Sequence, residues 1–274
     1  ALLAIDEAVR NLVAVGGDPD RVAVLDNFCW GDPTKPDRLG GLVRAVQGCT
    51  DGARRYAMPF ISGKDSLFNE FDGQAIPGTL LISAVGLVPD MAHAINSAGM
   101  HPGDDLWLVG RGGAALGGSL VDAVLDLGAT EVPQPLDDPL PRYRALHAAI
   151  SGGLITAAHD CSDGGVAVAI AEMAIAARAG VHVTVPADGL DPLGALTNEA
   201  PGRLVVAASP SDRDAVAAAL GSFGRRVGEV MDDDRIAMRV PDADDAAAGL
   251  DQARHTLVEV SIADALAAFT GGDA

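Results

Sequence analysis

The segment His159–Gly165, which reads His-Asp-Cys-Ser-Asp-Gly-Gly, carries the densest group of side chains that could do chemistry. It follows an apolar run and precedes a helix that the pattern predicts over 163–179. The Asp160 carboxylate could hold a hard cation while N–H groups at the start of the helix bind a phosphate. Alternatively, Ser162 or Asp163 simply caps the helix. Capping leaves Asp160 without a role, so both interpretations stay open at this point.

Two oxygen-bearing side chains share one face of a helix that is predicted over 2–14. Apolar residues recur there at helical spacing, and Gly16-Gly17 ends the pattern. Glu7 and Asn11 stand four residues apart on this helix, so they face the same direction. Both can offer oxygen to Mg²⁺, whereas the plainer alternative is a helix edge that faces solvent.

The segment Ser62-Gly-Lys-Asp-Ser66 suggests a phosphate loop at first sight. A Walker A motif needs Gly five residues before the Gly-Lys pair and Ser or Thr after the Lys, but Met58 and Asp65 hold those places. What remains is a strand end where Gly63 permits close backbone approach and where Lys64 and Ser66 can reach an anionic group. The alternative is an ordinary strand-to-turn transition.

A second glycine-rich segment, Gly110–Ala115, imitates the dinucleotide fingerprint after a predicted strand. That motif requires a helix beginning there and an acid at the end of the next strand. Here Gly117-Gly118 interrupts the helix, and Glu131 lies in a proline-flanked loop. The sequence therefore argues against a nicotinamide enzyme.

Two blocks of different pattern must position these side chains. Up to about residue 90 the pattern is α+β, with helices over 2–14 and 39–56, strands over 21–26, 58–62 and 79–88, and a hairpin around 72–73. The remainder alternates strands and helices as α/β layering does, with strands over 104–109, 154–158, 181–185, 204–208 and 235–240, and helices over 139–151, 163–179 and 211–220. The boundary falls near 90–102, which gives domains of 1–97 and 98–274.

Composition excludes several classes of protein. The 274 residues carry 19 Lys and Arg against 38 Asp and Glu, a net charge of −19, so we expect neither a nucleic-acid partner nor a membrane surface. A hydrophobic fraction of 49% excludes a disordered chain. The 3 widely spaced cysteines favour a reducing cytoplasm. The acidic runs 232–234 and 242–245 are predicted to be solvated turns.

Read together, five motifs resemble a known family. They occur in the order Ile-Asp-Glu-Ala-Val-Arg-Asn-Leu (5–12), Leu-Asp-Asn-Phe-Cys-Trp (25–30), Pro-Phe-Ile-Ser-Gly-Lys-Asp-Ser-Leu (59–67), Leu-Gly-Gly-Ser (116–119) and His-Asp-Cys-Ser-Asp-Gly-Gly-Val-Ala-Val-Ala (159–169). The set resembles the second half of the synthetase subunit of phosphoribosylformylglycinamidine synthase, within the aminoimidazole ribotide synthase superfamily. Because the chain starts without Met inside a predicted helix, we expect a piece of a longer polypeptide.

The resemblance implies a two-domain fold of the aminoimidazole ribotide synthase type, with an N-terminal α+β half-barrel domain and a C-terminal α/β domain. It also implies a reaction. Formylglycinamide ribonucleotide, ATP and glutamine-derived ammonia give formylglycinamidine ribonucleotide, ADP and phosphate. ATP phosphorylates the formamide oxygen, ammonia attacks the resulting iminophosphate, and Mg²⁺ neutralises the transferring phosphoryl group. The implied partners are the first half of the subunit and a glutaminase that supplies ammonia.

Site residues follow from the same resemblance. At an auxiliary nucleotide site it assigns Mg²⁺ to Glu7, Asn11 and Asp160, and the nucleotide, ATP or ADP, to Ser162. The family's catalytic histidine belongs to the first half, so no catalytic residue is expected here.

A second group is implied to reach the catalytic site of the first half. Asp26 and Gly63 would contact its ATP, and Ser66 would contact the substrate. Lys64 departs from the family's short form, where Asn often serves the metal. A cation cannot ligate Mg²⁺, so we assign Lys64 to a phosphate.

Two other functions remain open on the sequence alone. One is a different ATP-dependent member of the superfamily, such as aminoimidazole ribotide synthase. The other is a non-catalytic scaffold that binds nucleotide and Mg²⁺. An exposed half-barrel would also allow the chain to pair with itself as a homodimer.

Overall fold

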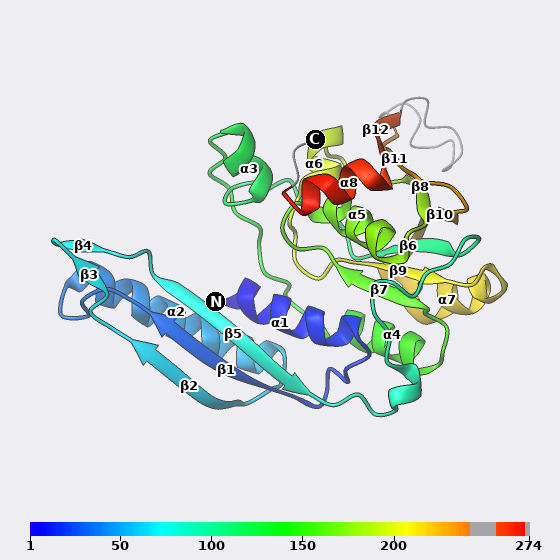
Figure 1. The fold of residues 1–274 in the computed structure, drawn as a ribbon. Coiled ribbons are helices and arrows are strands. Elements are labelled where there is room, and N and C mark those ends of the chain that lie inside the picture. The colour runs from blue at the N-terminus through cyan, green and yellow to red at the C-terminus, as the bar shows by residue number, and fades with distance from the viewer. Residues whose placement is uncertain (242–255, 272–274) are drawn as a thin grey trace.

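The computed structural model describes residues 1–241 and 256–271, in which two main sheets of unequal size lie side by side (Figure 1). The three-stranded sheet belongs to the first predicted block and the seven-stranded sheet to the second. Of the two acidic runs, 232–234 forms the bend between β10 (Gly224–Met231) and β11 (Arg235–Arg239), as predicted. The run 242–245 lies outside the described residues.

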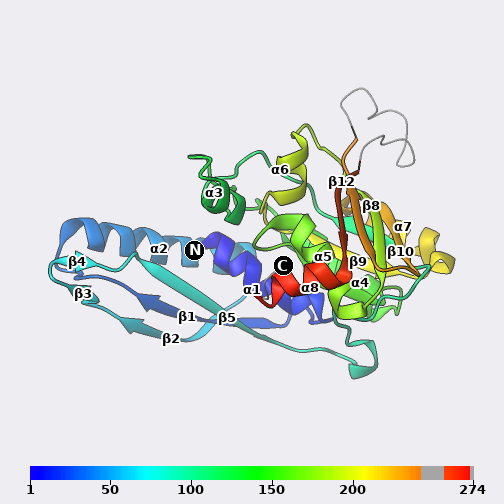
Figure 2. The same ribbon diagram turned by 45° about the horizontal axis from the view of Figure 1, so that its top comes forward.

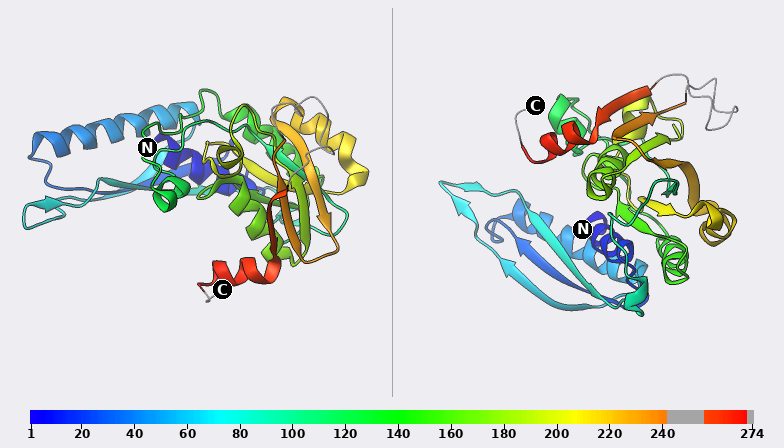
Figure 3. Two further views of the ribbon diagram at one scale, coloured as in Figure 1. Left: turned by 90° about the horizontal axis from the view of Figure 1, so that it is seen from above. Right: turned by 45° about the vertical axis from the view of Figure 1, so that its right-hand side comes forward.

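The first block comprises α1 (Leu2–Ala14), β1 (Val22–Cys29), α2 (Pro36–Arg55), β2 (Phe60–Ser66), the hairpin of β3 (Glu70–Phe71) and β4 (Gln74–Ala75), and β5 (Thr79–Gly86). Strand β1 is central, parallel to β2 and antiparallel to β5. Helix α2 lies along one face of this sheet (Figure 3). Proline at its first turn suits a helix start, where the missing N–H has no partner to lose.

The second block adds thirteen helices and strands after a short 3₁₀ turn (Met91–His93). These are β6 (Asp105–Val109), α3 (Leu120–Leu125), α4 (Leu140–Ser151), β7 (Ala157–Asp160), α5 (Gly165–Ala177), β8 (Gly180–Thr184), α6 (Pro192–Thr197), β9 (Leu204–Ala208), α7 (Arg213–Leu220), β10, β11, β12 (Thr256–Ser261) and α8 (Ile262–Phe269). Their strands are ordered β12-β11-β8-β10-β6-β9-β7, with mixed direction. Within the described part of the chain, every helix is too short or too polar to span a bilayer.

Strand β6 shows how the large sheet is covered on both faces. All five of its residues are buried. Leu106 and Leu108 join the core under α5, whereas Trp107 and Val109 join the core under α4 and α7. Successive side chains of a strand point to opposite faces of the sheet, so a continuous apolar run indicates that helices cover both faces.

Helix α1 links the two blocks. Ile5, Val9 and Val13 are fully or almost fully buried and belong to one core that also contains residues of the small sheet, α4 and α7. Figure 2 shows α1 in the middle of the molecule, between the three-stranded sheet and the α/β layers. The apolar stripe that predicts the helix is therefore the contact that joins the two blocks.

Several element boundaries differ from prediction. The strand predicted over 154–158 is β7, Ala157–Asp160, because Leu154 still completes the C-terminal turn of α4 by donating to Ala149 O. The strand predicted over 21–26 continues to Cys29, paired with β2 and β5 on both sides. Strand β10 was not predicted, since Arg225, Arg226 and Glu229 interrupt its apolar pattern.

Candidate nucleotide site

A buried carboxylate on α1 organises the candidate site. Asp6 is 1% exposed and accepts hydrogen bonds from four donors. Its Oδ1 accepts hydrogen bonds from the hydroxyls of Tyr56, the C-cap residue of α2 (2.5 Å), and Tyr143 on α4 (2.6 Å). Its Oδ2 accepts from Arg10 Nη1 (2.5 Å) and from the Gly202 N–H (2.9 Å). Burial, and then the charge of Asp6, raise the pKa of both phenols, so they remain donors. A carboxylate has about four lone-pair positions, and here all are used.

Arg10 connects Asp6 to two of the predicted site residues, Ser162 and Asp160. Its Nη2 donates to Ser162 Oγ at 3.0 Å, and its Nε lies 3.5 Å from Asp160 Oδ2. Burial disfavours its charge, but Asp6, Tyr143 and Asp160 outweigh burial and raise the pKa of Arg10. Neither Asp6 nor Arg10 was predicted from the sequence as a site residue. The available signal was an acid and a base four residues apart, beside an apolar stripe.

Asp160 lies at the end of β7 and is 8% exposed. Ser162 Oγ donates to its Oδ2, and His159 Nδ1 lies 3.4 Å from its Oδ1. The other ring nitrogen of His159 faces Glu172 on α5 at 3.1 Å. Burial alone would raise the pKa of Asp160, but His159, Ser162 and Arg10 together lower it to about 2. The carboxylate is therefore ionised.

The capping interpretation of Ser162 and Asp163 is wrong. Helix α5 has Gly164 as its N-cap, in a left-handed conformation, and no side chain caps it. Instead, Glu199 Oε1 accepts the N–H of Gly164 at 2.9 Å and the N–H of Leu120 at 2.8 Å. Glu199 comes from the loop after α6, so the sequence pattern gave no sign of this role. Ser162 is thereby left to Arg10 and Asp160.

These residues surround a cavity of about 220 Å³ between α1 and the β7–α5 loop, hereafter the α1 cavity. Its wall includes Glu7, Arg10, Ser162, Asp163 and Glu199, together with the backbone of the 117–118 glycine pair. Two of the predicted site residues, Glu7 and Ser162, thus lie on one wall although they are far apart in sequence. A third, Asp160, does not line the cavity itself but accepts a hydrogen bond from Ser162, which does.

The α1 cavity carries an excess of negative charge. Burial, and the charges of Asp160 and Asp163, raise the pKa of Glu7 against the lowering effect of Arg10. Carboxylate oxygens of this kind suit a hard cation. Within 1–241 and 256–271, however, no three His, Cys, Asp or Glu side chains form a ready metal cluster. Asn11 is exposed and lies one turn further along α1. The oxygen donors thus suit Mg²⁺ chemically, but they are not already gathered around one metal position.

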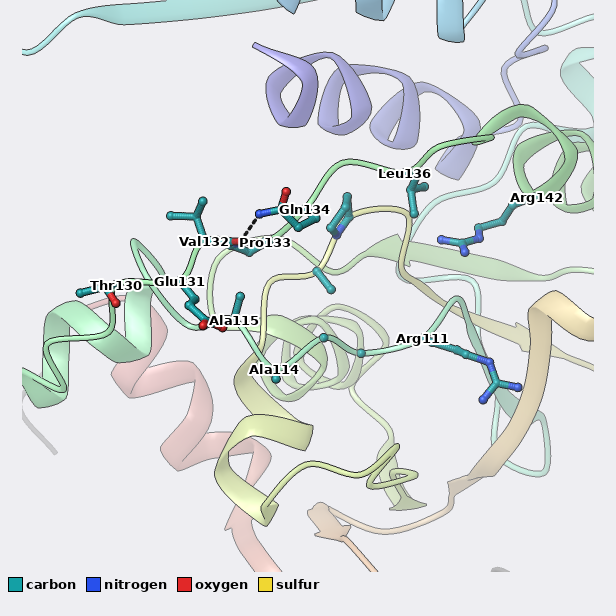
Figure 4. A pocket seen from close by; sticks show the side chains of 14 residues that line it. Arg111, Ala114, Ala115, Thr130, Glu131, Val132, Pro133, Gln134, Leu136 and Arg142 are labelled. Carbon is teal, nitrogen blue, oxygen red and sulfur yellow. Dashed lines mark hydrogen bonds between the residues drawn. The ribbon is translucent and has the colours of Figure 1, made fainter.

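A larger cavity of about 640 Å³ adjoins the first and shares Val132, Pro133 and Pro201 with it. Figure 4 shows Arg111 and Arg142 at one end and Thr130 at the other. The glycine-rich loop lines it, but two of its N–H groups donate to Asp188 and Asn198 side chains. In a dinucleotide fingerprint such N–H groups bind the pyrophosphate, whereas here two of them already have partners within the protein.

The remaining predicted site residues lie on the small sheet. Asp26 on β1 stands opposite Gly63 on β2, on the face shared with buried Val24. A Cβ atom at position 63 would lie 2.2 Å from Asp26 Oδ1, so glycine there leaves room for that carboxylate. Lys64 and Ser66 alternate with Gly63 and therefore point to the opposite face. Among described residues, no hydrogen bond or ion pair joins this group to the α1 cavity.

Comparison with known proteins identifies the family. The family described as AIR synthase related protein, N-terminal domain, matches residues 1–88, and the corresponding C-terminal domain matches 101–241. The chain belongs to the AIR synthase related proteins. The predicted fold class is thereby confirmed, with an α+β domain followed by an α/β domain. Residues 89–100 fall between the two matches, and the boundary at 97 stays a prediction.

Curated relatives of this AIR synthase related chain are much longer than the chain itself. It is 38% identical over 230 residues to the phosphoribosylformylglycinamidine synthase subunit PurL of Chelativorans sp., covering 82% of this chain and 30% of that protein. With PurL of Brucella ovis it shares 41% identity over 212 residues, covering 76% and 28% respectively. The chain thus spans less than a third of these relatives.

Solved structures agree on the fold. T. maritima PurL complexed with ATP superposes with a TM-score of 0.69 at 17% identity, over 96% of this chain and 40% of that one. HypE of E. coli superposes with a TM-score of 0.67 at 20% identity, over 94% and 78% respectively. At such identities the likeness concerns the fold alone.

Replacing Asp6 by Asn should destabilise the protein strongly. The amide would turn an N–H₂ group toward donors and leave the buried Arg10 with only the more distant Asp160 as counter-charge, which costs roughly 3–5 kcal/mol of unfolding free energy. Urea unfolding measures the loss. Asp51→Asn, an exposed acid on α2, should change it by about 0.5 kcal/mol or less. A loss below about 1 kcal/mol for Asp6→Asn would contradict the organising role of this carboxylate.

Asp160 should contribute to stability in a defined pH window. Its pKa falls from 3.8 to about 2 on folding, so its stabilising contribution is present above pH 4 and disappears as pH falls toward 2. That contribution is roughly 2 kcal/mol. Unfolding free energies measured between pH 5 and 2 should therefore decline less steeply in Asp160→Asn than in the wild type. Identical slopes would show that the carboxylate is not held ionised by its neighbours.

Proposed function

We propose that the α1 cavity binds ADP or ATP together with Mg²⁺. The observation that carries the proposal is the convergence of α1 and the β7–α5 loop, which brings Glu7 and Ser162 onto one cavity, with Asp160 hydrogen-bonded to Ser162. Sequence motifs separated by about 150 residues of chain had suggested the same set. The carboxylates that line the cavity would repel a bare polyphosphate, so the proposal pairs the nucleotide with the metal.

In this site Glu7, Asn11 and Asp160 would hold the metal, and Ser162 would contact the nucleotide. Bound Mg²⁺ supplies charge neutralisation for the phosphates. Gly118 suits close approach, because it has a positive φ of 77° and no atom lies within 4 Å of the position a Cβ would take. A nucleotide phosphate can therefore approach this backbone without a clash.

We further propose that the chain supplies the second half of an ATP-dependent, amidine-forming ligase, the synthetase subunit of phosphoribosylformylglycinamidine synthase. The PurL relatives at 38% and 41% identity support this role. Complexes of T. maritima PurL with ATP, with ADP and with FGAR support nucleotide and formylglycinamide ribonucleotide as ligands. The two domains would be 1–97 and 98–274.

Within that enzyme, the small sheet would serve the catalytic site completed by the first half. Asp26 and Gly63 would contact ATP there, and Lys64 a phosphate. Ser66 would contact the formyl substrate. Asp26 and Lys64 face opposite sides of the sheet, so they would reach different parts of the ligand or of the partner. Ammonia would come from a glutaminase, a partner for which the T. maritima PurLQS structure offers a precedent of assembly.

A non-catalytic role for the α1 cavity itself is the second candidate. Its wall contains Arg10, which is bonded to the same carboxylate that ties α1 to α2 and α4. A ligand bound there would stabilise the junction of the two blocks by mass action. The two candidates are compatible, because one concerns the cavity and the other the whole enzyme.

Thermal melting with ADP and Mg²⁺ tests the binding proposal. We expect the melting temperature to rise only when both are present, and Asp160→Asn to lower the ADP affinity at least tenfold, since a charged oxygen ligand is lost. Asp51→Asn is the matched control and should bind as the wild type does. Unchanged ADP affinity in Asp160→Asn would overturn the assignment.

The catalytic proposal predicts dependence on the other half. The 274-residue chain alone should not hydrolyse ATP when formylglycinamide ribonucleotide and ammonia are added, whereas the chain mixed with the first half of a PurL relative should. Coupled detection of ADP measures the rate. Substrate-dependent ATP hydrolysis by the chain alone would contradict a composite catalytic site.

A further inference from the structure

One nitrogen of Arg10 lacks an acceptor. The residue is 5% exposed and lies on the wall of the α1 cavity. Nη1 is bonded to Asp6 and Nη2 to Ser162, but the buried Nε has no hydrogen-bond partner. Among the described residues, the Nε atom forms only a long ion pair with Asp160 Oδ2, at 3.5 Å. An enclosed charged donor without an acceptor is costly, and such groups call for a specific explanation.

We propose that Arg10 is a nucleotide-binding residue, with its Nε–H donating to a phosphate oxygen and Asp6 acting as its positioning residue. The inference rests on the proposed nucleotide site and adds to it the residue that recognises the phosphate. A guanidinium is planar and always charged, so fixing two of its nitrogens also fixes the direction of the third. Here Asp6 and Ser162 hold those two.

The surroundings favour a phosphate that arrives with its metal. Glu7, Asp163 and Glu199 line the same cavity and would repel a free anion. Mg²⁺ bound by the carboxylates would offset that repulsion, and Arg10 would take an oxygen that the metal leaves free. The rigidity comes from α1, on which Asp6 and Arg10 are i,i+4 neighbours in the buried core.

Calorimetric titration of the full chain with ADP and with adenosine, each with Mg²⁺, tests the proposal. Arg10→Met should weaken ADP binding about tenfold or more and leave adenosine binding unchanged, because only ADP carries the phosphates. Arg10→Lys should lie between, since it keeps the charge but loses the fixed fork. Arg144→Met is the control; that exposed arginine pairs with Asp20 and should leave both ligands unaffected.

Arg10→Met also leaves the buried Asp6 carboxylate without its counter-charge. The double variant Asp6→Asn/Arg10→Met, which removes both charges, is therefore measured beside it as the control for that effect. In the wild type, the Arg10 Nε–H resonance should shift on addition of ADP with Mg²⁺ and not on addition of adenosine. Equal losses for ADP and adenosine, or an unmoved resonance in a chain that binds ADP, would overturn the role of Arg10. No ADP binding by the wild type would overturn the proposed nucleotide site itself.

Discussion

Asp6 is the carboxylate on which the arrangement of the chain depends. Its four hydrogen bonds come from α1 itself, α2, α4 and the turn before β9, so one side chain ties the small sheet's helix to the α/β layers. A buried charge is tolerable only when every lone pair has a donor. The position of α1 is therefore set by electrostatics as well as by its apolar stripe.

The positions of the candidate site residues also depend on the Asp6 carboxylate. Arg10, held by Asp6, contacts Ser162 and balances Asp160, and Asp160 in turn is braced by His159. Because Glu199 takes over the capping of the β7–α5 turn, Ser162 is available to the cavity. In a chain with a net charge of −19, this buried arginine places one positive charge beside carboxylates that would otherwise repel a phosphate.

Periodicity predicted the elements whose burial is simple. Helix α1 and the helix after Gly164 were found because their apolar residues recur at regular spacing, and the conjunction of Glu7 with Asp160 followed from family motifs. Strand β10 was missed because its polar residues find partners elsewhere in the fold, as Arg226 does with Asp105.

The residues that organise the site were harder to foresee. Asp6 and Arg10 resemble an ordinary surface pair until tertiary packing buries them, and Glu199 acts on turns that lie far from it in sequence. The family resemblance assigned Asp26 and Lys64 to the same catalytic site, whereas the strand pleat separates their faces. Long-range burial and register are properties of the fold and leave little trace in local spacing.

The most direct measurement is a crystal structure of the chain with ADP and Mn²⁺, recorded at a wavelength where manganese scatters anomalously. The account predicts an anomalous peak coordinated by Glu7 and Asp160, at roughly the 2.1 Å typical of a small divalent ion bound to oxygen, with the phosphates beside Ser162. A nucleotide in the larger cavity between Arg111 and Arg142, with no manganese near Glu7, would contradict it.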